Sequence, residues 1–87
     1  MQIVHYIPHQ RFKITVFRSG NRFIVKFDDT DHDISIKFRE GEVNNLNDVV
    51  AQVDSKMLDQ ITHHFSQLSD FRADRFRGLS SKYPEII

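Results

Sequence analysis

The sequence predicts an α+β fold: a four-stranded antiparallel β-meander followed by two or three C-terminal helical segments packed on one face. Three observations predict it. Apolar and polar residues alternate in the first half, turn-forming residues separate the alternating runs, and the apolar period becomes helical near residue 46. A chain of 87 residues forms one domain at most. We expect that domain over residues 1–79 and a C-terminal tail over 80–87.

The first predicted strand covers residues 2–7, which are rich in residues that favour β-structure. A turn that contains proline follows it and leads to the second strand. The inward face of this first strand is left open by the pattern, because Val4 and Tyr6 compete for it with Ile3 and Ile7.

A β-hairpin is predicted next, with strands over residues 11–18 and 22–27 and a turn at 19–21. Residues directly opposite each other in an antiparallel pair share a face, so the loop length can be tested against the apolar pattern. A loop with an even number of residues places Val16 opposite Val25, whereas an odd loop mixes apolar and polar positions. The other pairs predicted for the even loop are Ile14 with Phe27 and Lys13 with Asp28.

The fourth predicted strand covers residues 33–38 and follows a turn centred on residues 30–31. This turn pairs Phe27 with Ile34 and Val25 with Ile36, which keeps the apolar residues on one face. The predicted inward set is Phe12, Ile14, Val16, Phe23, Val25, Phe27, Ile34, Ile36 and Phe38.

Helical periodicity begins at Leu46 and continues along one broad apolar stripe. Asn44 or Asn45 is suited to cap the first turn. One helix running to Phe76 would be about 46 Å long, which exceeds the width of a small domain, so the helix must break or protrude. The stripe consists of Leu46, Val49, Val50, Val53, Met57, Leu58, Ile61, Phe65 and Leu68.

Two positions favour breaks. Asp54 would fall within the apolar stripe of a continuous helix, and Asp54-Ser55 can cap a helix that begins near Lys56. Ser69-Asp70 offers a similar start for a third segment over residues 71–77, which Gly78 would then end.

Composition narrows the functional classes. Twelve Lys and Arg residues balance twelve Asp and Glu residues, and the chain contains no cysteine. No basic leader with an apolar core stands at the N-terminus, and the apolar runs are too short to span a bilayer. These features predict a soluble cytoplasmic protein that needs no disulfide and does not act at a membrane.

Charge is nevertheless distributed in blocks, with five cations and no acid among residues 1–27 and four aspartates within residues 28–33. On the predicted register, the sheet face turned away from the helices carries cations around an aromatic ring, a combination that can bind single-stranded nucleic acid. The order of four strands and a helix also resembles that of the Pur-alpha and Whirly folds, over the first two thirds of the chain and without a shared residue motif. The residues for this alternative function are Lys13, Phe17, Arg22, Lys26 and Lys37.

Metal and catalytic sites find less support. Asp29, Asp31, Asp33 and Glu40 have the carboxylate spacing of an EF-hand calcium loop, but Ile34 stands where that loop needs glycine. The five histidines show no convergent ligand spacing, and no nucleophile or phosphate-binding motif is present. We therefore expect neither an enzyme nor a metal or cofactor site.

Surplus apolar surface is the stronger functional signal. Eight phenylalanines are a large aromatic load for a small domain, and residues 71–77 alternate rings with guanidinium groups, a composition favoured at protein interfaces. We predict a small non-catalytic binding or scaffold protein that forms a homodimer and can hold a protein partner. The predicted interface residues are Phe17, Ile24, Phe71, Arg75 and Phe76.

Overall fold

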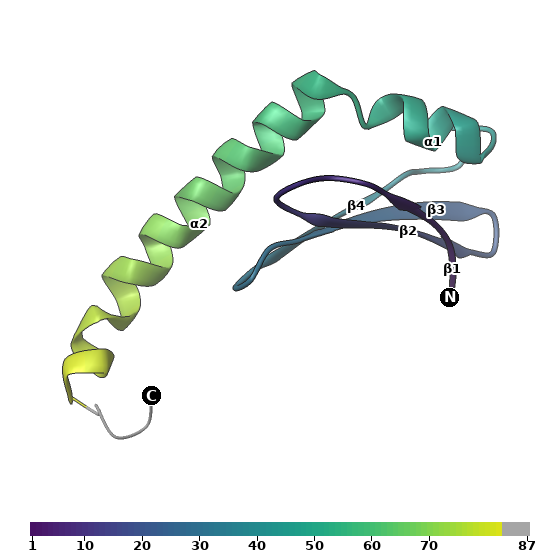
Figure 1. Cartoon of the computed structure of the whole chain (residues 1–87). Helices are drawn as coiled ribbons and strands as arrows, with labels where there is room; N and C mark the ends of the chain where they lie inside the picture. The colour runs from purple at the N-terminus through teal and green to yellow at the C-terminus, as the bar shows by residue number, and fades with distance from the viewer. Residues whose placement is uncertain (83–87) are drawn as a thin grey trace.

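A four-stranded antiparallel sheet, in the order β1-β2-β3-β4, is followed by two helices in the computed structural model (Figure 1). The structure describes residues 1–82, with side chains for residues 1–76. The predicted α+β class and the four-stranded meander are confirmed. The elements are β1 (Gln2–Ile7), β2 (Lys13–Ser19), β3 (Arg22–Asp28), β4 (Asp33–Lys37), α1 (Leu46–Gln52) and α2 (Ser55–Lys82).

The hairpin registers agree with the predicted pairs. Ser19 pairs with Arg22, so Gly20-Asn21 forms a two-residue loop, and Gly20 has a positive φ of 62° as the first residue of a type II′ turn requires. Asp28 pairs with Asp33 across a four-residue loop, again an even number. The pairs across these two hairpins include Val16 with Val25, Ile14 with Phe27, Lys13 with Asp28, Phe27 with Ile34 and Val25 with Ile36.

Strand β1 contains an irregularity that the alternating pattern does not reveal. The pairing of β1 with β2 shifts between Ile3 and His5, as in a β-bulge at Val4. Val4 and Ile7 pack against the core, while Ile3 and Tyr6 are 47% and 53% exposed. The inward face of this strand thus takes Val4 from one of the two competing sets and Ile7 from the other. The reason is that residues before and after the bulge alternate out of step with each other.

The turn between β1 and β2 is organised by His9. Its Nδ1 atom accepts hydrogen bonds from the backbone N–H groups of Arg11 (3.1 Å) and Phe12 (3.3 Å). Its ring stacks on that of Phe12 at a centroid distance of 4.8 Å. This histidine therefore has a structural role in the turn.

The core lies between one face of the sheet and the helices. The predicted inward residues of β2 and β3 are buried together with Val49 of α1 and with Ile61 and Phe65 of α2. Ile34, Ile36 and Phe38 are partly buried against the same cluster. In the described part of the chain, no helix lies against the opposite face of the sheet (Figure 1).

Helix α1 and the start of α2 begin at predicted caps. Oδ1 of Asn45 accepts the N–H of Asp48 at 3.0 Å, and Oδ1 of Asp54 accepts the N–H of Met57 at 2.9 Å. The predicted break at Asp54-Ser55 is therefore confirmed, since α1 ends at Gln52 and α2 begins at Ser55.

Of the two or three helical segments predicted, the structure contains two. The break favoured at Ser69-Asp70 is absent, because α2 continues from Ser55 to Lys82 through these residues and through Gly78. Serine and aspartate cap a helix only where the residues before them are not helical. Here the preceding residues are helical, so Ser69 and Asp70 are exposed polar residues inside α2. Arg72 and Arg75 lie over aromatic rings one turn away, which supports the helix across the expected break. The tail expected over residues 80–87 begins inside α2, and residues 83–87 lie outside the described residues.

Candidate functional site

The last part of α2 extends beyond the sheet. We call residues 69–82 the distal segment; it follows Leu68, the last of the described side chains of α2 that packs against the core. All side chains described in this segment, through residue 76, are exposed. Phe71 is 58% exposed and Phe76 is 45% exposed, which is unusual for two rings on one short stretch of helix. The distal segment is therefore the first candidate interaction surface.

Two arginines of the distal segment lie over its two rings. The guanidinium carbon of Arg72 is 5.1 Å from the centroid of Phe76, and that of Arg75 is 5.6 Å from the centroid of Phe71. These are i, i+4 cation–π pairs, which hold all four side chains in a defined arrangement on the helix. The predicted interface residues Phe71, Arg75 and Phe76 are thus brought together.

The sheet face without helices, here the open face, carries the other two predicted interface residues. Phe17 of β2 and Ile24 of β3 are Cα partners, and both are partly buried. Ile3 pairs with Phe17 from β1, so an apolar row crosses three strands. Tyr6 is exposed beside this row, opposite Thr15. The open face is the second candidate surface, and it lies on the side of the sheet opposite α1 (Figure 1).

The cations predicted for nucleic-acid binding share the open face with aspartates. The register places Lys13, Arg22, Lys26 and Lys37 on the same face as Phe17. Nζ of Lys26 lies 3.9 Å from Asp28 and 4.0 Å from Asp33, and Lys13 pairs with Asp28 in the register and lies over the ring of Tyr6. These carboxylates offset part of the positive charge that would attract phosphates.

The predicted interface residues did not include Ile3 and Arg72, which contribute to these two surfaces. Ile3 joins the open face because of the β-bulge, for which a single strand offers no sequence signal. Arg72 joins the distal segment through its contact with Phe76, and the i, i+4 spacing of the two residues was the signal that could have revealed it.

The turn between β3 and β4 concentrates acidic side chains at the end of the sheet over which α2 passes. Oδ1 of Asp29 accepts hydrogen bonds from the N–H groups of Asp31 (2.8 Å) and His32 (2.7 Å), and it lies 3.4 Å from Nδ1 of His32. The ring of His32 is 6.5 Å from that of Phe65 in α2. Asp31 and Asp33 remain exposed.

The carboxyl group of Asp29 has a lowered pKa. Burial by itself raises this pKa, but the two backbone hydrogen bonds and the neighbouring His32 together outweigh it. A lowered pKa in the folded state means that ionised Asp29 stabilises the fold above its unfolded pKa of about 4 and that this stabilisation is lost as the pH falls through the folded pKa.

Acidification is therefore expected to reduce the stability advantage of the wild-type chain over the variant D29N, since asparagine keeps the oxygen acceptor and lacks the charge. Urea unfolding midpoints measured between pH 6 and pH 3 should converge below about pH 4. A constant difference between the two proteins over this range would contradict the role given to Asp29.

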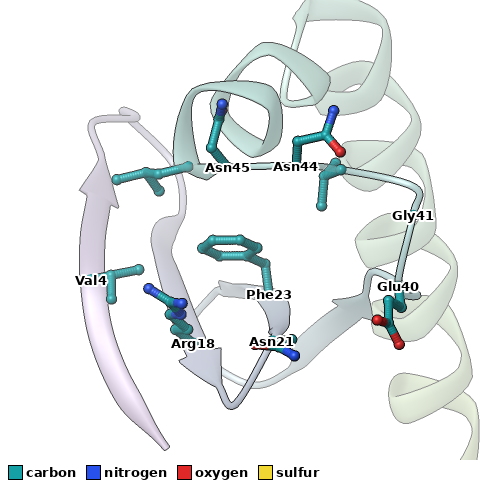
Figure 2. A pocket seen from close by; sticks show the side chains of 10 residues that line it. Val4, Arg18, Asn21, Phe23, Glu40, Gly41, Asn44 and Asn45 are labelled. Atoms are coloured by element: carbon teal, nitrogen blue, oxygen red, sulfur yellow. The ribbon is translucent and has the colours of Figure 1, made fainter.

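A cavity of about 510 Å³ lies between the sheet and the start of α1, with the ring of Phe23 as its floor (Figure 2). Three of its polar groups serve the fold: Oδ1 of Asn45 caps α1, the N–H of Asn44 donates to Asp48, and Nε of Arg18 donates to the carbonyl oxygen of Gly20. Phe23 itself is only 9% exposed.

Within residues 1–82, no cluster of three or more histidine or acidic side chains has the arrangement of a metal site. The rings of His63 and His64 are 6.1 Å apart on the surface of α2. No helix in the same part of the chain is long and apolar enough to cross a membrane.

Comparison of this chain with protein-family models, with curated proteins and with solved structures finds no match.

Proposed function

We propose that this chain is a small non-catalytic binding or scaffold protein that acts as a homodimer through the distal segment of α2. The observation that carries the proposal is the exposure of Phe71 and Phe76 on a helix that has left its own sheet. Exposed rings grouped with arginines are characteristic of the anchor positions of protein interfaces.

The dimensions of the chain support a partner chain, because, within the described residues, part of α2 has no surface of its own chain to pack against. Its radius of gyration is 16.1 Å, compared with about 12 Å for a compact domain of this length. Its longest extent is 50 Å, and α2 alone is about 42 Å long. A projecting helix of 14 residues is marginal in water unless it packs against something, so a second chain would stabilise the distal segment.

A second copy is favoured as the occupant because the distal segment and the acidic turn carry opposite charge. The distal segment contains four cations and two acids, and residues 28–33 contain four aspartates. The open face, with Phe17 and Ile24, would stay accessible in such a dimer and could hold a different protein partner.

The proposal is tested by sedimentation of the wild-type chain over a range of concentrations. We expect a monomer–dimer equilibrium, which the double variant F71A/F76A shifts strongly towards monomer because both anchors are lost. The matched control is F17A, which removes the same kind of ring from the open face and is expected to leave the dimer intact. A wild-type monomer at high micromolar concentration would overturn the proposal.

A single-stranded nucleic-acid binder is the second candidate, favoured by the gathering of Lys13, Arg22, Lys26 and Lys37 around Phe17 on the open face. Titration with a labelled oligonucleotide at two ionic strengths separates the candidates, because phosphate contacts weaken steeply with salt. Binding at low salt that K37E abolishes would support this function, and absence of binding at low salt would eliminate it.

A further inference from the structure

One face of α2 changes its chemistry where the helix leaves the sheet. Over the sheet this face carries Ile61, Phe65 and Leu68, which pack in the core. At about 100° per residue, the same face continues in the distal segment, where two arginines are flanked by two rings within an arc of about 140°. Around that arc the order is Phe71, Arg75, Arg72 and Phe76.

This face is built to bind carboxylates. Each guanidinium group lies over a ring at 5.1 or 5.6 Å, and stacking of this kind leaves the N–H edges of the guanidinium group available to acceptors. In a contact with a second chain, the rings on both sides would shield those edges from water and so strengthen an ion pair formed there. The described side chains of Arg72 and Arg75 are both exposed.

The acidic turn between β3 and β4 supplies matching carboxylates. Asp31 is exposed on this turn, and Asp33 is exposed at the start of β4, where it also lies 4.0 Å from Nζ of Lys26. His32 between them lies beside Phe65, near the point where α2 leaves the sheet. Among the described residues, no ion pair joins an aspartate of this turn to an arginine of α2 in the same chain. The distal segment and the turn between β3 and β4 lie at the same end of the molecule (Figure 1).

From this arrangement we infer that, in the homodimer, Arg72 and Arg75 of each chain bind Asp31 and Asp33 of the second copy. If a two-fold axis lies beside the end of the sheet, this contact forms twice. The arginines of each chain then meet the aspartates of the other chain, as in any isologous dimer. The inference rests on the proposed homodimer and names the surface that receives the distal segment.

Charge exchange tests the inference. The variants R72E/R75E and D31K/D33K are each expected to weaken dimerisation by about tenfold or more, because each places like charges in contact. An equimolar mixture of the two variants should form a heterodimer, because both of its contacts are attractive. One contact pairs the exchanged charges, and the other pairs the original arginines and aspartates. The matched control R11E/K37E changes the net charge as much as R72E/R75E does, at exposed positions in the turn between β1 and β2 and in β4, and should dimerise like the wild-type chain.

Sedimentation velocity at low and high salt reads out these equilibria, and circular dichroism confirms that each variant is folded. The wild-type dimer is expected to weaken as salt rises, because screening reduces ion pairing. A wild-type monomer overturns the proposed function together with this inference. A wild-type dimer that F71A/F76A dissociates, but that R72E/R75E leaves unchanged or that mixing does not restore, overturns this inference alone.

Discussion

Replacing Val25 with asparagine is expected to lower the free energy of unfolding by about 3 to 5 kcal/mol, enough to unfold much of the protein. Val25 lies in β3 with none of its side chain exposed, and it is paired with Val16 on one side and Ile36 on the other. Asparagine would lose the apolar burial and would place an amide where the neighbouring side chains offer no hydrogen-bond partner.

Ile24 is the matched control, because it precedes Val25 in the same strand and lies on the open face. The variant I24N is expected to cost about 1 kcal/mol, since its side chain is only partly buried. Urea unfolding followed by circular dichroism gives both free energies. Equal destabilisation by the two variants would mean that the faces of β3 are not distinguished in the way the register requires.

Replacing Phe65 with alanine is expected to destabilise the protein by about 3 to 5 kcal/mol, the usual range for removing a buried phenylalanine. Phe65 is 4% exposed and joins α2 to the sheet, with ring centroids 5.0 Å from Phe12 and 6.5 Å from His32. Its removal would leave a cavity beneath the middle of α2, which the turn that carries His32 can fill only in part.

The variant F65L provides the graded comparison, because leucine fills most of the same volume and should cost about 1 kcal/mol. Thermal unfolding monitored at one fixed protein concentration compares the two variants with the wild-type chain, which removes any effect of dimerisation on the midpoint. A small effect of F65A would show that α2 is not anchored to the sheet at this residue.

The meander was predictable because its information is local. Alternation along each strand identifies its apolar set, and the number of residues in each turn then determines which positions face each other. For this reason the pairs of Val16 with Val25 and of Val25 with Ile36 followed from the order of residues alone. The caps at Asn45 and Asp54 were predictable in the same way, since a cap acts within its own first turn.

The departures arose where the outcome depends on contacts between distant parts of the chain. The bulge at Val4 is a property of the pair β1–β2, so neither strand shows it when considered by itself. The residues at Ser69-Asp70 are suited equally to a helix start and to an exposed helix turn, and nothing in their neighbourhood decides between the two.

The sequence by itself therefore determined the fold class, the two hairpin registers, the division of the sheet into a core face and an open face, and helix starts at or within one residue of those observed. Only the tertiary structure showed that α2 extends beyond the sheet and leaves Phe71 and Phe76 exposed. The physical reason is that periodicity identifies which side of a helix is apolar, whereas the length of the sheet beneath it decides how much of that side is buried.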